Sequence, residues 1–380
     1  MAALDWLTDA ARLRADAGLH RTLTPRPRPG LNHGDPIDLA SNDYLGLGRH
    51  PEVQEAACAA VRCWGGGATG SRLVSGTTIL HEQLESDLAV FAGTESALVF
   101  SSGYTANLGV VAALSGRGSL VLSDSASHAS LVDACRLSRA RVEVYDRTDI
   151  GAVETKLQTR TEERALVVTD SVFSADGDLA PLRELYALCR RYSAALVVDE
   201  AHGIGVRGAG GRGLVHELGL QSKPDLVVTA TLSKSLASQG GVVLGPAAVR
   251  EHLIDVARPF IFDTGLAPAA VGAARGALAV LTREPERANA VRERAADLAE
   301  IVGVDAPESA VVSVILGDPE CAYAAAQEAR SRGVHVGCFR PPSVPAGTSR
   351  LRLTARANLT EAELDTVRAV LGPILQGVRV

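Results

Sequence analysis

DLVVTATLSKSLASQGG, residues 225–241, joins a short apolar run to a single lysine. The run Leu226–Val228 is typical of a buried strand, and small hydroxyl residues and glycines follow it. Lys234 lies among these small residues with no acidic residue near it in the sequence. Most lysines are solvated on protein surfaces. A lysine just past a buried strand is therefore a candidate functional residue.

The same alternation of short β-branched runs and longer helical stretches extends from about residue 36 to 245. Seven runs predict strands: 97–100, 120–122, 142–145, 166–169, 196–198, 226–229 and 242–244. Unbroken apolar runs are typical of parallel strands that are buried on both faces. We therefore predict an α/β fold with a mostly parallel central sheet flanked by helices.

Beyond about residue 260 the pattern changes. Alanine-rich stretches predict helices over 267–282 and 286–301, two further strands follow over 310–316 and 350–354, and a last helix begins near 360. A chain of 380 residues is too long for one simple core. We predict an N-terminal helix and connector over 1–40, a large α/β domain over 41–260 and a smaller α+β domain over 261–380.

Composition and charge exclude several classes of function. The formal net charge is −6 with scattered cations, which disfavours a nucleic-acid partner. Early acidic residues, Asp5 and Asp9, are unlike a signal peptide, and the longest nearly apolar stretch, 266–281, is too short to span a bilayer. The six cysteines form no CxxC pair and fit no metal-ligand spacing. We expect a cytoplasmic protein with reduced thiols, without a metal site and away from membranes.

Ligands of open parallel sheets bind beyond the carboxyl ends of the strands, so the residues that follow each strand are best considered together. SSGYTAN (101–107) begins a helix and can bind a phosphate with its backbone N–H groups, although an ordinary strand-to-helix turn explains it as well. DEAHGIG (199–205) supplies Asp199 and His202, which a helix cap or a buried salt bridge would also explain. His128, taken alone, is more typical of a satisfied core histidine.

Lys234 connects these groups, because a partly desolvated lysine has a lowered pKa and can act as nucleophile or base. A phosphate site, a strand-end carboxylate and such a lysine together fit pyridoxal phosphate. Lys234 would form the Schiff base, Asp199 would hold a proton on the pyridine nitrogen, and the His128 ring would stack on the cofactor. Three more side chains could hydrogen-bond the phenolic oxygen or the phosphate: Ser174, His202 and Thr231.

Across nearly its whole length the chain resembles the α-oxoamine synthase family of fold-type I pyridoxal phosphate enzymes. The resemblance rests on eight ordered blocks, which are far more specific together than any single motif. They are LASNDYLGL (39–47), GATGSRLVSGT (67–77), FSSGYTANLG (100–109), SDSASHASLVDAC (123–135), VVTDSVFSADGDLAPL (167–182), LVVDEAHGIGVRGAGGRG (196–213), TLSKSL (231–236) and RPPSVPAGTSRLRLTARA (340–357).

The resemblance implies a role for each matching position. The catalytic set is Lys234, His128, Asp199 and His202, with Ser174 beside the phenolic oxygen. The phosphate would be held by Gly103, Tyr104 and Thr231, together with Thr264 from the second subunit of a homodimer whose active site lies at the interface. Substrate-side residues are Asn42, Ser75, Arg352 as the ligand of the amino-acid carboxylate, Arg340 near it, and Arg21 near the entrance for the acyl chain. Without the resemblance, Arg340 and Arg352 are more typical of strand-edge surface charge.

The implied reaction is a decarboxylative condensation of L-alanine with a pimeloyl thioester, carried on coenzyme A or an acyl carrier protein. One alternative is a related synthase that uses glycine or serine with another acyl thioester. A second is a non-catalytic relative, although Lys234 and its partners are all present. A third is a dinucleotide-binding oxidoreductase, because GGGATG (65–70) and GIGVRG (203–208) match the glycine fingerprint by letter. Neither stretch has the strand-then-helix context that this fingerprint requires.

Overall fold

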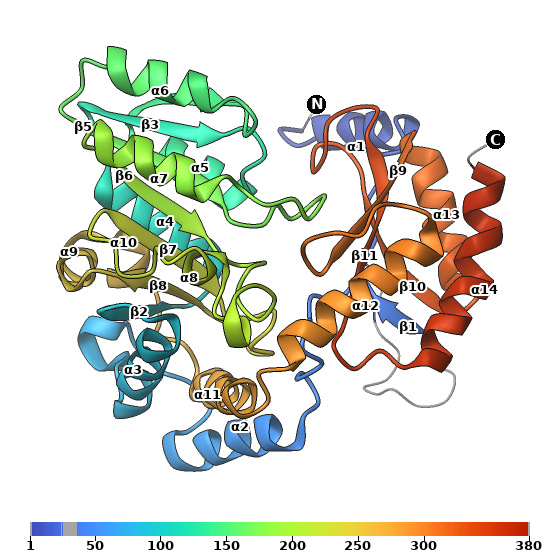
Figure 1. Cartoon of the computed structure of the whole chain (residues 1–380), viewed down its shortest axis with the longest axis horizontal. Coiled ribbons are helices and arrows are strands. Elements are labelled where there is room, and N and C mark those ends of the chain that lie inside the picture. The colour runs from blue at the N-terminus through green and yellow to red at the C-terminus, as the bar shows by residue number, and fades with distance from the viewer. Residues whose placement is uncertain (1, 24, 26–35, 379–380) are drawn as a thin grey trace.

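The computed structural model describes residues 2–23, 25 and 36–378, which form two sheets with helices packed on them (Figure 1). The larger sheet has seven strands in the order β2-β8-β7-β6-β5-β3-β4. Their bounds are β2 (Ser96–Phe100), β3 (Ser119–Asp124), β4 (Arg141–Tyr145), β5 (Arg164–Asp170), β6 (Ala195–Asp199), β7 (Leu226–Thr231) and β8 (Gly241–Gly245). Each of the seven apolar runs is a strand, as predicted.

The pairing in this sheet is mostly parallel, which confirms the predicted fold class. Strands β3 to β7 run parallel to one another, and β8 is antiparallel to both β7 and β2. The strands are buried on both faces except β4 at the sheet edge, where Val142 and Val144 are exposed. The apolar run thus predicted correctly that β4 is a strand. It did not predict that β4 lies at the sheet edge with side chains exposed to solvent.

Helices cover both faces of the larger sheet. One face packs on α3 (Ile79–Ala92), α6 (Ile150–Thr159), α7 (Leu182–Arg191) and α11 (Pro268–Arg283). The other packs on α4 (Gly103–Leu114), α5 (Ala129–Ser138), α9 (Ala247–Val256) and α10 (Arg258–Ile261). Two further elements flank this body, namely α2 (Pro51–Trp64), which packs on α11, and the short α8 (Leu214–Glu217). The sheet is therefore a rigid base for the loops at its carboxyl edge.

The smaller sheet has its own hydrophobic core and the strand order β1-β10-β11-β9. Its elements are β1 (Ile37–Leu39), β9 (Val311–Gly317), β10 (Val334–Phe339) and β11 (Ser349–Thr354), with α12 (Arg287–Val302), α13 (Pro319–Ser331) and α14 (Glu361–Val378). Strand β1 pairs parallel with β10, whereas α11 contributes to the core of the larger sheet. The domain boundaries at 40 and 260 stay predictions.

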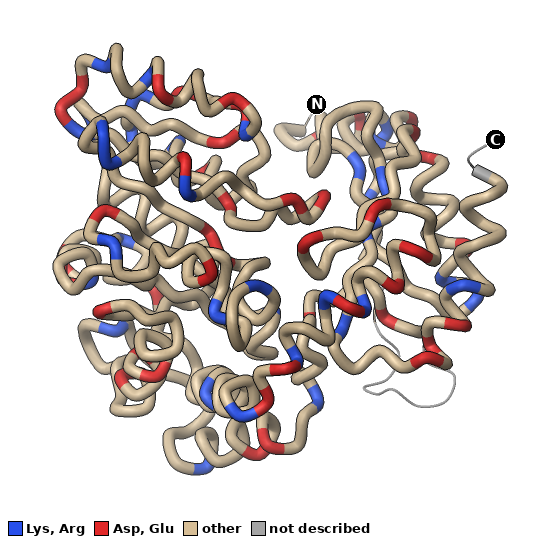
Figure 2. The backbone as a smooth tube through the Cα atoms, viewed as in Figure 1, with Lys and Arg blue, Asp and Glu red and all other residues tan. Residues whose placement is uncertain are grey.

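Two further observations concern the surface. Helix α1 (Trp6–Asp16) forms where the sequence predicts a helix, but none of its residues is buried. Lysine and arginine residues are mixed with aspartate and glutamate residues around both sheets (Figure 2). The described chain shows no large basic region. No helix in the described ranges is both long and apolar enough to cross a membrane.

Candidate active site

The carboxyl ends of β5, β6 and β7 bring the central predicted residues together. Asp170 and Asp199 end adjacent strands in register, and Asp199 is paired with Thr229 on β7. Lys234 follows β7 by three residues. Burial lowers the pKa of Lys234 to about 8, although the nearby carboxylates of Asp199 and Asp170 act in the opposite direction. With this pKa roughly a tenth of the amine is unprotonated at pH 7, far more than for an ordinary lysine, and the unprotonated form is the one that acts as a nucleophile or base.

Asp199 is buried and held in one orientation. Its Oδ2 accepts a hydrogen bond from Asn107 Nδ2 at 2.6 Å, and its Oδ1 accepts one from the backbone N–H of Ala201 at 2.8 Å. Asn107 lies on α4 and its Oδ1 accepts from Thr229 Oγ1 at 2.6 Å, so the amide is fixed from two sides. The sequence did not single out Asn107, although it lies in the SSGYTAN block.

His202 is kept neutral by its surroundings. Burial lowers its pKa well below the ordinary value, and the positive charges of Lys234 and Arg352 lower it further. Its Nδ1 lies 2.6 Å from the hydroxyl oxygen of Tyr44, which is fully buried. Burial also raises the pKa of Tyr44, so its hydroxyl stays protonated. His202 is thus a neutral hydrogen-bonding group rather than a cation.

Arg352 reaches the site from β11 of the smaller sheet. Its Nε donates to the carbonyl oxygen of Ser174 at 2.5 Å and its Nη1 donates to Asn42 Oδ1 at 3.1 Å. Cζ lies 5.2 Å from the centroid of the Phe339 ring. The arginine is buried, so the structure excludes the strand-edge surface charge that its sequence position also allowed. Three predicted residues, Asn42, Ser174 and Arg352, form one hydrogen-bonded group.

The predicted phosphate site lies at the beginning of α4. Ser102 is the N-cap and accepts from Thr105 N, which leaves the first N–H groups of the helix, from Gly103 onward, directed outward. A Cβ at Gly103 would lie 3.1 Å from Cβ of Thr231, so these two residues line one narrow space. Tyr104 is exposed and its hydroxyl donates to Asp133. The close approach places Thr231 beside the N-terminus of α4, where both could contact an anion bound by the free N–H groups.

His128 caps α5 with its Nδ1 2.7 Å from Ser130 Oγ, and its ring is exposed. Its backbone N–H donates to Asp170 Oδ2 at 2.9 Å. Sequence reasoning missed Asp170, although it directly follows a predicted strand. Burial raises the pKa of Asp170 well above the ordinary value, and the charge of Asp199 adds to this effect. Asp170 thus positions the histidine from the end of the strand next to that of Asp199.

Several predicted residues lie elsewhere on the surface. Ser75 is exposed in the short helical turn Arg72–Gly76, and Thr264 is exposed and paired with Ser71 by an isolated bridge. Arg340 donates to the carbonyl oxygens of Gly18 and His20, beside the exposed Arg21. Their roles toward substrate or a second subunit stay predictions.

The donor set fits pyridoxal phosphate. An outward-facing helix N-terminus with a glycine offers a phosphate site, a fixed buried carboxylate offers a partner for a pyridinium, and an exposed imidazole offers a stacking face. Within the described residues the amine of Lys234 makes no hydrogen bond or ion pair, so it is free to react with an aldehyde. In the described chain no group of His, Cys, Asp and Glu side chains is arranged to hold a metal ion.

Comparison with known proteins agrees with this geometry. The family model for aminotransferase class I and II matches residues 34–371. The chain is 66% identical over 377 residues to the 8-amino-7-oxononanoate synthase of Mycobacterium sp. (strain JLS), covering 99% of this chain and 98% of the relative. A structure of SPT with PLP internal aldimine superposes with a TM-score of 0.90 at 32% identity, over 99% of this chain and 98% of that one.

A further solved structure, 8-amino-7-oxononanoate synthase from Francisella tularensis, matches with a TM-score of 0.77 at 26% identity, covering 92% of this chain and 99% of that one. Fold and site together define a pyridoxal-phosphate-dependent enzyme of fold type I. The chain belongs to the aminotransferase class I and II family and, within it, to the group of the 8-amino-7-oxononanoate synthases. It is a pyridoxal-phosphate-dependent acyltransferase.

Proposed function

We propose that this chain condenses L-alanine with a pimeloyl thioester to give 8-amino-7-oxononanoate, carbon dioxide and the free thiol of coenzyme A or an acyl carrier protein, a step of biotin synthesis. Alanine Cα loses its proton and bonds to the acyl carbonyl carbon as the thiolate leaves; the carboxylate then leaves as carbon dioxide, and a proton takes its place on Cα. The observation that carries the proposal is the 66% identity over 99% of the chain to a relative of that name.

The chain's own residues divide the work between binding and proton transfer. Arg352 would bind the alanine carboxylate, because a guanidinium fixed by Ser174 and Asn42 can present paired donors. Lys234, with its pKa near 8, would take the Cα proton once its amine is free. Bound pyridoxal phosphate supplies the electron sink for the carbanion, and Asp199 would keep its ring nitrogen protonated. Neutral His202 would hydrogen-bond the phenolic oxygen without adding charge.

The test is turnover of the purified holoenzyme with pimeloyl-CoA and one amino acid at a time. We expect thiol release and 8-amino-7-oxononanoate with L-alanine, and at least about tenfold lower kcat/KM with glycine or L-serine. Lys234→Ala should retain the cofactor and lose turnover, since it removes the only group assigned to the Cα proton. Higher kcat/KM with glycine or serine would assign the chain to a related synthase.

We also propose that the chain is a homodimer whose subunits meet at a rim defined here as Leu73, Val74, Ser75, Phe262 and Thr264. Leu73, Val74 and Phe262 are 52%, 84% and 68% exposed, which is unusual for large apolar side chains so close together. The bridge between Ser71 and Thr264 joins the two segments of the rim. Asp263, beside it, accepts a hydrogen bond from Ser101, so the rim adjoins the phosphate site.

Light scattering of the purified chain tests this assembly. Val74→Glu should convert a dimer into monomers and lower turnover, because it places a charge in an apolar contact. Val144→Glu is the matched control: Val144 is 61% exposed on β4, at the opposite edge of the sheet from β2, and its substitution should leave the mass unchanged. A monomeric but fully active chain contradicts the proposal.

A further inference from the structure

A small hairpin after β5 supplies the oxygen atom that orients Arg352. Residues 172–179 fold back on themselves, with a bridge between Val172 and Leu179 and a hydrogen bond from Phe173 N to Asp178 O at 2.9 Å. Ser174, near the start of this hairpin, accepts the Nε–H of Arg352. A shift of the hairpin therefore moves one of the two oxygen atoms that fix the guanidinium plane.

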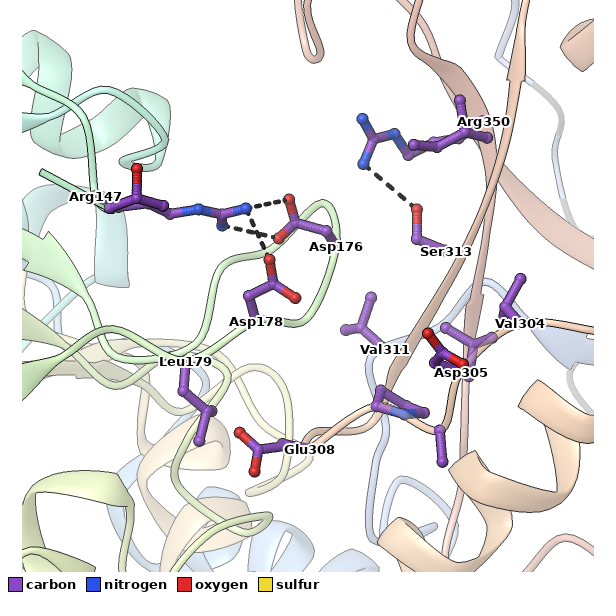
Figure 3. Close-up of a pocket in the computed structure, with 15 residues that line it drawn as sticks. Arg147, Asp176, Asp178, Leu179, Val304, Asp305, Glu308, Val311, Ser313 and Arg350 are labelled. Atoms are coloured by element: carbon purple, nitrogen blue, oxygen red, sulfur yellow. Dashed lines mark hydrogen bonds and ion pairs between the residues drawn. The ribbon is translucent and has the colours of Figure 1, made fainter.

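One guanidinium holds the hairpin from its outer side. Arg147, in the loop after β4, makes two parallel hydrogen bonds to Asp176 at 3.2 and 3.0 Å and a third to Asp178 at 2.7 Å (Figure 3). Its Cζ also lies 4.5 Å from the centroid of the Phe173 ring. The contacted residues lie on both sides of Ser174. Bidentate, partly buried pairs of this kind are stronger and more directional than ordinary surface ion pairs.

The contacts of Arg147 with the hairpin also keep Asp176 and Asp178 away from a second cation, Arg350. It lies two residues before Arg352 on β11, and because alternate strand residues share a face, both arginines point from the smaller sheet toward the hairpin. A pocket of about 720 Å³ separates Arg350 from Asp176 and Asp178 (Figure 3). In the described contacts Arg350 bonds only neutral oxygens, of Thr348 and Ser313. Without Arg147, the two carboxylates would be left facing this cation.

We propose that Arg147 is a positioning residue for amino-acid binding: it fixes the 172–179 hairpin so that Ser174 holds Arg352 in the orientation that a carboxylate requires. The inference rests on the proposed role of Arg352 in carboxylate binding. Arg147 does not itself reach the reacting atoms. Loss of Arg147 would free the hairpin and let Asp176 and Asp178 turn toward Arg350. This movement of the hairpin would carry the Ser174 carbonyl away from Arg352.

The experiment compares Arg147→Ala with Arg141→Ala in the holoenzyme. Arg141, on β4, is a matched control because it also makes a two-point pair, with Glu162, but does not touch the hairpin. We expect Arg147→Ala to raise the KM for L-alanine, and the Kd read from the change of the cofactor absorption band, about tenfold or more. The KM for pimeloyl-CoA should stay within about twofold and cofactor content unchanged. Arg141→Ala should leave all these values unaltered.

Two milder variants keep the test decisive if Arg147→Ala folds poorly. Arg147→Lys keeps the charge but loses the paired geometry and the ring contact, so it should give an intermediate Kd. Asp176→Asn should raise the Kd in the same direction. If folded variants bind L-alanine like the wild type while only their melting temperature falls, Arg147 is merely structural and the inference is wrong. A wild type with no L-alanine turnover, or an unimpaired Arg352→Ala, refutes instead the proposed function on which the inference rests.

Discussion

Replacing Glu200 with Gln should change how the stability of the chain depends on pH. Glu200 directly follows Asp199, is almost fully buried, and has no cation beside it among its described contacts. Its Oε2 accepts from Ser171 Oγ at 2.7 Å and its Oε1 accepts from Val215 N at 2.6 Å. These bonds favour the anion, but burial outweighs them and raises the pKa of Glu200 from 4.5 to about 7.

The sign and size of the effect follow from proton linkage. Between the ordinary pKa of 4.5 and about 7, the folded chain keeps the Glu200 proton and the unfolded chain releases it. The stabilisation is therefore complete below pH 4.5 and is lost as the pH rises through 7. At about 1.4 kcal/mol for each pH unit, the loss reaches about 3 kcal/mol. Gln can still accept from Val215 N with its amide oxygen and can donate its amide N–H to Ser171 Oγ, so uncharged Glu200→Gln should lose this dependence.

Urea unfolding of the cofactor-free protein, at intervals from pH 5 to pH 8.5, measures the difference without a contribution from ligand binding. The wild type and Glu200→Gln should differ least at the acidic end, diverge as the pH rises from 5 to about 7, and keep a constant difference above that, with the variant more stable. Glu217→Gln is the control, because the pKa of Glu217 is lowered, burial being outweighed by its bonds to Arg207 and Gly208. Parallel curves for the wild type and Glu200→Gln would refute the reasoning.

Three further predictions concern the site. The rate at which the cofactor-free chain takes up pyridoxal phosphate should rise with pH and level off above about 8, because the unprotonated amine of Lys234 is the group that reacts. Stopped-flow absorbance would measure this rate, and a rate that does not change with pH would contradict the prediction. Arg352→Lys should raise the KM for L-alanine roughly 10- to 100-fold, because an ammonium cannot form the two parallel hydrogen bonds of a guanidinium to a carboxylate. Steady-state kinetics would measure the KM, and an unchanged value would show that Arg352 does not bind the carboxylate. Gly203→Ala should cost about 1–3 kcal/mol, because its Cβ would overlap Glu200 Oε2; an unchanged urea midpoint would contradict this.

The larger sheet could be predicted from the sequence because its strands are buried on both faces, and such strands are continuous apolar runs. Strand β10 was missed for the opposite reason. Only Val334 and Val336 of this strand are buried, and they alternate with half-buried His335 and Gly337, so no continuous run exists. Strand β1 has only three residues and depends on pairing with β10 far along the chain. Neither short length nor distant pairing leaves a local signal.

The site residues also fall into those that the sequence predicted and those that it did not. Asp199, His202 and Lys234 follow strands of one parallel sheet, so the rule that ligands bind at the carboxyl edge brought them together from the sequence alone. Asn42 and Arg352 belong to the surroundings of the other sheet, and only the family resemblance pointed to them. Asp170, Asn107 and Arg147 act through other side chains, and nothing in their local sequence distinguishes an indirect role from ordinary solvent exposure.

The charges of the crevice support the proposal that amino-acid binding depends on the orientation of Arg352. His202 is uncharged, because burial and the neighbouring Lys234 and Arg352 disfavour its protonation. In the proposed reaction Lys234 acts as a neutral amine, so it cannot serve as the permanent partner of a carboxylate. Among the three basic groups of this cluster, Arg352 is left as the lasting positive charge, and a guanidinium binds a carboxylate well only in a paired geometry. Loss of support from the hairpin can therefore weaken amino-acid binding even when every charge in the crevice remains.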